Sequence, residues 1–339
     1  ALGSLLKGIV QTLPRSRTAL LALLAAKEAV AGFTGLQDTA VISASTVGGM
    51  DLSETRYAAW AAGEASDLQD VHEHPVGSHT THVARMLGSR ALRTTISTAC
   101  SSSANALAMG AELLLAGESD RVLAGGADAL CRFTVEGFRA LGAMDTAPVR
   151  PFSGDRAGMN LGEGAAYLIL EREDDAARAG RTPLALLAGW CNSNDAHHQT
   201  ATSPDGAGPY RAMAGALRMA GATANDVDHI NAHGTGTDNN DGTELAAMER
   251  LFPVMPPFTS TKGSTGHTLG AAGALEAVIA IICMREGIIP ASPNPIVPMA
   301  GHRSGPVTST LRRPVRNVLS SSFGFGGNDT ALYLTSPRP

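Results

Sequence analysis

Cysteine is scarce in this sequence, and its four copies stand far apart. No two of them form a CxxC pair and none lies at metal-ligand spacing; they are Cys100, Cys131, Cys191 and Cys283. Secreted proteins often pair their cysteines as disulfides, whereas isolated thiols are typical of a reducing compartment. The sequence therefore predicts no metal site and a cytoplasmic location.

Long hydrophobic runs and an excess of positive charge are also missing. The longest apolar stretch near the start covers residues 19–26 and ends at Lys27 and Glu28. It is shorter than the roughly 20 residues that a membrane-spanning helix needs, and it lacks the layout of a signal peptide. The formal net charge is −5, which gives no electrostatic footprint for nucleic acid. We expect neither a membrane nor a nucleic-acid partner.

Strand and helix patterns alternate along the chain, which predicts an α/β fold with βαβ units and a largely parallel sheet. The 339 residues, 44% of them hydrophobic, suffice for one large domain or for two half-domains around a shared core. Strands are expected at 40–43, 94–96, 122–124 and 165–171, and helices at 18–31, 53–63, 107–115, 174–179 and 269–285. The stretches 72–81 and 134–158 are expected to be irregular.

Two small-residue corners, Ser97-Thr98 and Ser264-Thr265, each open a helix of similar length. A joint at residues 181–183 separates them, so we expect two halves, residues 1–180 and 181–339. The similarity favours a duplicated α/β unit whose two helix N-termini face each other. Chance similarity in an alanine- and glycine-rich sequence is the alternative.

Cys100 lies at the first corner, between a β-branched run and a helical pattern that Gly117 ends. A helix N-terminus offers free N–H groups and the positive end of the helix dipole, which favour thiolate over thiol. The N–H of Cys100 could also bind a developing oxyanion. We therefore expect a nucleophile with a lowered pKa. A small buried residue in a tight turn is the alternative for a lone cysteine.

Three glycine-rich segments follow Cys100 in the chain: residues 231–238 (NAHGTGTD), 262–267 (KGSTGH) and 322–329 (SFGFGGND). Each would be weak evidence alone, because such turns are common. In this order, and together with the segments RPF at 150–152 and GEGA at 162–165, they make a specific pattern. The chain from about Arg17 to its end resembles the elongating β-ketoacyl-[acyl carrier protein] synthases of the thiolase superfamily.

The resemblance implies a thiolase-like fold of two duplicated halves in five layers, α-β-α-β-α. The half 1–180 would carry the nucleophile Cys100, and the half 181–339 would carry His233 and His267. Relatives begin with a further strand and helix, where this sequence has only residues 1–12 and no initiator Met. We therefore expect a truncated or incompletely given chain.

The implied reaction is a decarboxylative Claisen condensation. An acyl group would move from its carrier to Cys100, and malonyl-carrier would then lose carbon dioxide and attack it. The N–H groups of Cys100 and Phe325 would form the oxyanion hole, and neutral His233 and His267 would stabilise the enolate. A helix dipole just after His267 would help to keep its ring neutral.

Lys262 needs a carboxylate partner if it is buried, and the family match for that partner is Glu276. We interpret this as a structural ion pair that supports the histidines, with a direct role for Lys262 as the alternative. Asp329 departs from the family, which usually has Asn at this position of the G-F-G-G-x-N pattern. A carboxylate there is expected to add negative charge near Lys262.

Thr235 and Thr237 match residues that bind the phosphopantetheine arm of the acyl carrier protein, although Thr-Gly-Thr also suits an ordinary turn. Phe325 matches the gate between the acyl pocket and the catalytic chamber. Arg139 matches a carrier-docking position, with a merely solvated arginine as the alternative. No cofactor is expected beyond the phosphopantetheine of the carrier.

Other members of the superfamily are weaker matches. A catalytically silent chain-length-factor-type subunit would lack the nucleophile, and a degradative thiolase would need a second active-site cysteine, which Cys283 in its helical pattern does not supply. Segments 142–152 and 159–164 look more like polyene-type synthases than fatty-acid ones. The resemblance also implies a dimer through the strand 94–97, with a second copy or with a silent relative.

Overall fold

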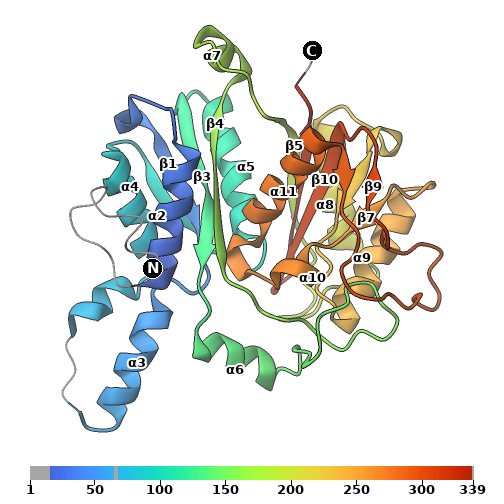
Figure 1. Ribbon diagram of the computed structural model, residues 1–339, viewed down its shortest axis with the longest axis horizontal. Helices are drawn as coiled ribbons and strands as arrows, with labels where there is room; N and C mark the ends of the chain where they lie inside the picture. Colours follow the sequence, from blue (N-terminus) through green and yellow to red (C-terminus); the bar gives the residue numbers. More distant parts are fainter. Residues whose placement is uncertain (1–15, 65–67, 338–339) are drawn as a thin grey trace.

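The computed structural model describes residues 16–64 and 68–337 and contains two main β-sheets (Figure 1). The expectations for residues 1–12 lie outside this range. The first sheet has the strand order β2-β1-β3-β4 and consists of β1 (Ala40–Ala44), β2 (Arg93–Ile96), β3 (Arg121–Asp128) and β4 (Gly164–Glu171). The second has the order β5-β11-β10-β6-β7 and consists of β5 (Leu186–Asn194), β6 (His229–Asn231), β7 (Phe258–Thr259), β10 (Asn317–Gly324) and β11 (Asn328–Thr335).

Both sheets are mixed, so the expectation of a largely parallel sheet is met only in part. β1 runs parallel to β2 and β3, but β4 is antiparallel to β3. β6 runs parallel to β10 and β7, whereas β11 is antiparallel to both β10 and β5. A tight turn joins β10 to β11, and only antiparallel strands can be joined in this way.

Helices cover both faces of each sheet, which gives the expected five layers (Figure 1). The central layer consists of α5 (Ser102–Leu115) and α11 (Ala272–Glu286). The outer layers are α2 (Arg17–Ala29) with α4 (Ser78–Leu87) on the first sheet, and α8 (Ala207–Met219) with α9 (Asp238–Leu251) on the second. The α/β class and the layer order predicted from the sequence are confirmed.

The remaining elements are short or lie at the margins of these layers. They are α3 (Met50–Ala61), α6 (Arg132–Ala140), α7 (Glu173–Arg178), α10 (Lys262–Thr265), β8 (Ile288–Ile289), β9 (Leu311–Arg312) and the 3₁₀ turns η1 (Leu36–Asp38), η2 (Leu68–Glu73), η3 (Ala224–Asp226) and η4 (Leu269–Ala271). Two expectations of irregular structure are wrong in part, because α4 begins inside 72–81 and α6 extends into 134–158. No helix of the described residues is long and apolar enough to cross a membrane.

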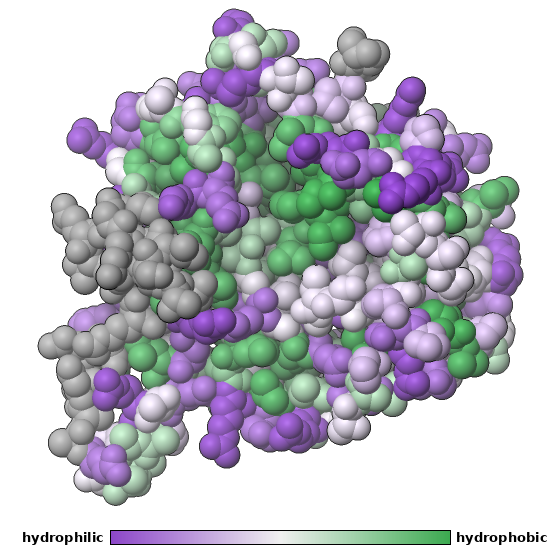
Figure 2. All heavy atoms as spheres, viewed as in Figure 1, coloured by the Kyte–Doolittle hydropathy of each residue, from purple (hydrophilic) through white to green (hydrophobic). Residues whose placement is uncertain are grey.

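The central helices form the main core because both pack between two sheets. One buried cluster joins residues of α5 and α11 to strands of both sheets, with Leu107, Ile281 and Leu332 among its members. α11 is apolar on nearly every side, as is typical of a helix enclosed by other elements. On the face seen in Figure 2, apolar residues gather in the middle, where α11 lies, and polar residues surround them.

The N-termini of α5 and α11 touch, and glycine makes this contact possible. A Cβ atom at Gly273 would lie 2.7 Å from the backbone N of Ala104 and 2.8 Å from its Cβ. Next to it, the N–H of Ala274 donates a hydrogen bond of 2.9 Å to Ser103 Oγ. The corner that carries Cys100 therefore lies against the start of the helix that follows His267, as the sequence predicts.

We expect Gly273→Ala to destabilise the protein although alanine favours helix. The added methyl group would push α5 and α11 apart, and overpacking of this kind costs about 1–3 kcal/mol. The matched control is Gly137→Ala in exposed α6, where a Cβ would meet nothing within 4 Å and should stabilise by roughly 0.5–1 kcal/mol. Urea unfolding measures both changes. Equal stability of the two variants would contradict the tight contact.

Candidate active site

One cavity of about 400 Å³ opens beside the contact between α5 and α11. Six of the residues singled out from the sequence line it: Cys100, His233, Thr235, Thr237, His267 and Phe325. Lys262 and Glu276 lie buried behind the histidines, and Arg139 lies outside the cavity on the surface of α6. The structure thus brings together eight of the nine predicted residues.

Cys100 is held in a sharp turn between β2 and α5. Ala99, just before it, has a positive φ of 52°, which is unusual for a residue with a side chain and strains the backbone. Ser102 fixes the turn, because its Oγ donates to the carbonyl of Ala99 at 2.6 Å and accepts from the N–H of Thr98 at 2.8 Å. The loop of Gly324 passes so close that a Cβ there would lie 3.2 Å from Cys100 N.

The Cys100 thiol is protonated in the resting site, which corrects the expectation of a lowered pKa. Burial raises the pKa of Cys100 to about 11. The positive charge of Lys262 and a hydrogen bond from the Phe325 backbone lower the pKa of this thiol, but by less than burial raises it. A helix N-terminus favours thiolate, as the sequence suggests, but burial is the largest cause acting on this thiol and the net shift of its pKa is upward.

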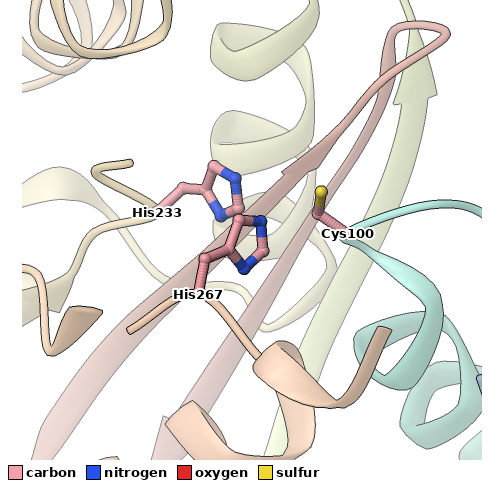
Figure 3. A group of neighbouring side chains, drawn as sticks. All are labelled: Cys100, His233 and His267. Carbon is pink, nitrogen blue, oxygen red and sulfur yellow. The ribbon is translucent and has the colours of Figure 1, made fainter. Parts of the chain in front are cut away.

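His233 follows β6 and His267 follows α10, and their rings meet edge to face with centroids 5.4 Å apart (Figure 3). One nitrogen of each ring and Cys100 Sγ all lie within 4.8 Å of one another. Burial, followed by the charge of Lys262, lowers the pKa of both imidazoles well below the usual range. Both rings are therefore neutral, as expected from the sequence, and burial is the first cause of their lowered pKa.

The hydrogen bonds at Nδ1 fix the tautomer of each histidine. Lys262 Nζ lies 3.3 Å from His233 Nδ1, and the backbone N–H of Leu269 donates to His267 Nδ1 at 3.2 Å. Both groups are donors only, so each Nδ1 accepts and each Nε2 carries the hydrogen. His267 Nε2 has no hydrogen-bond partner within the described residues. The pair thus presents two N–H donors, which suit an anionic oxygen.

The same three residues stand close enough to hold a metal ion, but their hydrogen bonds oppose it. A histidine binds a metal through a nitrogen lone pair, whereas His233 and His267 use their lone pairs at Nδ1. The buried ammonium of Lys262 would also repel a cation. The geometry therefore favours an anion-stabilising site.

Lys262 and Glu276 form the ion pair expected from the sequence. Both side chains are 2% exposed, and their charged atoms lie 2.5 Å apart. Lys262 Nζ also donates to the carbonyl of His233 at 2.6 Å. Because α11 carries Glu276, this pair connects the His233 loop to the central helix.

Two carboxylates that the sequence analysis missed hold the loop of residues 233–237. Glu244 accepts the N–H groups of His233 and Gly234, both at 2.8 Å, and Asp241 Oδ1 accepts that of Thr235 at 2.9 Å. Both acids lie on α9, three residues apart, and so on one helix face. The sequence does contain a signal for this role: two acidic residues three positions apart, directly after a glycine-rich loop whose N–H groups they could accept.

Thr235 and Thr237 form the cavity wall next to His233, and their hydroxyl oxygens lie 2.8 Å apart. On another side of the cavity, Phe325 stacks on Phe138 of α6, with ring centroids 5.6 Å apart and an angle of 25°. Phe138 was not recognised in the sequence, because the segment around it was expected to be irregular. Arg139, next to it, pairs with Glu136 at 2.8 Å.

Asp329 is fully buried, but the charges that act on it are not those expected from the sequence. Its pKa responds to Asp195, Glu244 and Arg211, and Lys262 is not among the causes of its shift. The expectation that Asp329 adds negative charge near Lys262 stays a prediction, and the raised pKa of Asp329 favours the neutral acid near pH 7. Its strand, β11, points the carboxyl group toward α8 instead, since a Cβ at Gly208 would overlap it.

Comparison with known proteins places the whole site within one family. Residues 12–176 match the family model of the beta-ketoacyl synthase N-terminal domain, and residues 184–295 match that of the C-terminal domain. Nodulation protein E of Rhizobium meliloti is 35% identical over 335 residues, which cover 95% of this chain and 83% of that protein. The 3-oxoacyl-[acyl-carrier-protein] synthase 2 of Rhizobium meliloti is 41% identical over 249 residues, which cover 70% of this chain. That alignment spans 59% of the relative's length, as does the one with the mitochondrial synthase of Arabidopsis thaliana.

Solved structures give the same result for the fold. The ishigamide ketosynthase/chain length factor superposes with a TM-score of 0.93 at 32% identity and covers 100% of this chain and 86% of that one. A ketosynthase from Xenorhabdus doucetiae, solved in complex with its chain length factor, gives 0.84 at 33% identity, with 96% and 82% covered. The thiolase-like fold predicted from the sequence is confirmed.

We expect the alkylation of Cys100 by iodoacetamide to rise with pH without a plateau below pH 10. With a thiol pKa of about 11, the thiolate fraction grows about tenfold per pH unit over this range. Peptide mapping by mass spectrometry follows Cys100 separately from the other three cysteines, and Cys100→Ala supplies the background. A plateau between pH 7 and 8 would instead support the lowered pKa expected from the sequence.

Proposed function

Because this chain belongs to the β-ketoacyl synthase family, we propose that it catalyses the condensation of an acyl-enzyme thioester with malonyl-carrier. One observation carries the proposal: a thiol and two neutral N–H donors converge in one cavity. A condensing enzyme needs this set, since it must hold an acyl group and then stabilise a thioester enolate.

In the first half-reaction, Cys100 Sγ attacks the thioester carbonyl of an acyl-carrier. The S–C bond to the carrier breaks, and the thiol proton leaves with the carrier thiol. The developing oxyanion would lie between the N–H groups of Cys100 and Phe325. The hydrogen bond from the Phe325 backbone to the Cys100 sulfur supports this position, because it aims that N–H at the reacting atom.

In the second half-reaction, malonyl-carrier places its thioester oxygen between the Nε2–H groups of His233 and His267. Carbon dioxide leaves, and the enolate carbon attacks the acyl carbonyl on Cys100. The S–C bond to Cys100 breaks, and the sulfur takes up one proton as the thiol re-forms. Neutral imidazoles suit this role because they stabilise the enolate without over-stabilising the malonyl carboxylate. Lys262 acts indirectly by keeping His233 neutral and oriented.

The substrates reach the cavity on the phosphopantetheine arm of an acyl carrier protein. Thr235 and Thr237 would bind the amides of that arm, and exposed Arg139 would contact the carrier surface. No cofactor beyond this arm is part of the proposal. The two ketosynthase structures described with chain length factors support a ketosynthase relative as subunit partner, and polyketide- or polyene-type elongation is part of the proposal. A silent chain-length subunit is the second candidate function, but the complete set of Cys100, His233 and His267 argues against it.

We also propose that two thiolase-like subunits pair through the free edge of β2. This strand is last in its sheet, and its carbonyls at Leu92 and Ile96 accept bonds from β1. Because alternate residues of a strand face opposite edges, the N–H of Thr95 points outward, where a second chain could accept it. The partner is a second copy or a silent relative.

The histidine variants test the reaction. We expect His233→Ala and His267→Ala each to raise the decarboxylation barrier by about 2–4 kcal/mol, as the loss of an oxyanion donor does. Acylation of Cys100 should survive in at least one of them, and Cys100→Ser should lose condensation. Mass spectrometry of carrier-bound products after incubation with malonyl-carrier measures each step.

The matched control is His79→Ala, which removes a buried imidazole outside the cavity. This variant should lose stability but keep decarboxylation per folded molecule. Full-rate decarboxylation by either cavity variant would refute the proposed role of the histidines. Absence of any condensation by the unmodified chain with its subunit partner would favour the silent-subunit alternative.

The dimer prediction uses two substitutions at one position. Thr95→Val and Thr95→Pro both lose the 2.6 Å hydrogen bond to Thr80, but only proline removes the outward N–H. We expect the dimer dissociation constant to rise at least about tenfold for proline and to change little for valine. Sedimentation equilibrium measures the dimer dissociation constant. A wild-type monomer with full activity would contradict the proposal.

A further inference from the structure

Asp329 is a buried acid that the proposed reaction does not use. Its side chain is 0% exposed, and neither carboxyl oxygen has a hydrogen-bond partner within the described residues. Other buried acids near the cavity either accept several hydrogen bonds, as Asp128 does from Ser45, Thr46 and Gly270, or pair with a cation, as Glu276 does with Lys262. An ionised carboxylate with no donors is costly to bury.

A second carboxyl group lies beside it. Asp195 follows β5, and a Cβ built at Gly208 would overlap the Asp329 carboxylate and lie only 3.1 Å from Asp195 Cβ. On the other side, a Cβ at Gly327 would overlap Asp195 Oδ1. Glycine at both positions therefore leaves room for two acids packed together where β5 and β11 pair side by side.

The two acids join two loops of the cavity wall. Residues 200–202 of one loop and residues 324 and 325 of the other both line the cavity. Three hydrogen bonds connect the loops: Gly326 N to Gln199 O at 2.8 Å, Asn194 Nδ2 to Gly326 O at 3.0 Å, and Asp195 N to Gly327 O at 3.2 Å. Asp195 also shapes its own loop, because its Oδ2 accepts the N–H of Ser203 at 2.7 Å.

The charges around Asp329 come from three elements. Asp195 from the loop after β5 and Glu244 from α9 are acidic, and Arg211 from α8 is basic. Burial and the two acids raise the pKa of Asp329 to about 8, against a smaller lowering by Arg211. Asp329 is therefore a neutral acid near pH 7 and ionises as the pH rises through about 8.

We propose that Asp329 is a positioning residue that shares one proton with Asp195 and so holds together the two loops at the cavity mouth. A neutral acid can donate to the Asp195 carboxylate, whereas two ionised acids repel each other. Ionisation would loosen the loop that carries Phe325, the residue proposed for the oxyanion hole and the gate. The catalytic consequence rests on the proposed function, but the contact between the loops does not.

Asp329→Asn tests the shared proton, because an amide of the same shape donates at every pH. Hydrogen–deuterium exchange of peptides spanning 195–203 and 322–329 measures loop order without any substrate. We expect the wild type and the asparagine variant to exchange alike at pH 6.5. At pH 9 the wild type should exchange at least fivefold faster than the variant, and both are compared at the same pH so that intrinsic exchange cancels.

Asp329→Ala is the second variant, since alanine fits at this position but has no group that can donate a hydrogen bond to Asp195. The alanine variant should exchange fast at both pH values. If the ratio of exchange rates between the wild type and Asp329→Asn is the same at pH 6.5 and pH 9, the proposal is overturned. The rate of Cys100 acylation by acyl-carrier should follow the same pattern. If exchange follows the prediction while no variant, including wild type, is acylated, then the loop contact stands and the proposed function fails.

Discussion

Burial and the ammonium group of Lys262 together determine the protonation of Cys100, His233 and His267. The charge of Lys262 lowers the pKa of His233, His267 and Cys100, so that it favours neutral imidazoles and opposes the effect of burial on the thiol. Lys262 can remain charged at 2% exposure because Glu276 and the carbonyl of His233 accept its hydrogens. Loss of Glu276 would leave an uncompensated charge among the three reactive groups. The central helix α11 is therefore as necessary to the chemistry as the loops are.

The sequence predicts most elements of the fold, but not the direction of every strand. Apolar periodicity locates α5, a run of small and apolar residues locates α11, and short β-branched or apolar runs locate β1 and β3. α6 was missed although its sequence is amphipathic, because it is a short helix on the surface, has no buried residue and lies in a segment that looks irregular. The antiparallel directions of β4 and β11 depend on which strands meet in space, and local patterns do not contain that information.

The sequence predicts which residues form the site, but it does not predict the pKa shifts of those residues. Cys100 at a helix N-terminus is visible in the sequence, and the sign of the dipole effect is right. Burial nevertheless raises the pKa of Cys100, and the depth of burial follows only from the packing of the loops against Cys100. Asp329 shows the same limit, because its neighbours Asp195 and Glu244 are distant in the sequence. Charge effects require distances, and these come from the tertiary fold.

Buried carboxylates also explain how loops of irregular shape keep the reactive atoms in place. Each reactive loop packs against an acid that accepts backbone N–H groups: Glu244 holds the His233 loop, and Asp128 takes the N–H of Gly270 after His267. Several N–H donors reduce the cost of burying such a charge and fix the loop at several points, while burial still raises the pKa of Glu244 to about 8. Asp329 occupies a comparable place beside the Phe325 loop but has no such donors. Asp329 therefore has to carry a proton in order to stay buried. Among the described residues, a second carboxylate such as Asp195 is the group that could accept a hydrogen bond from that proton.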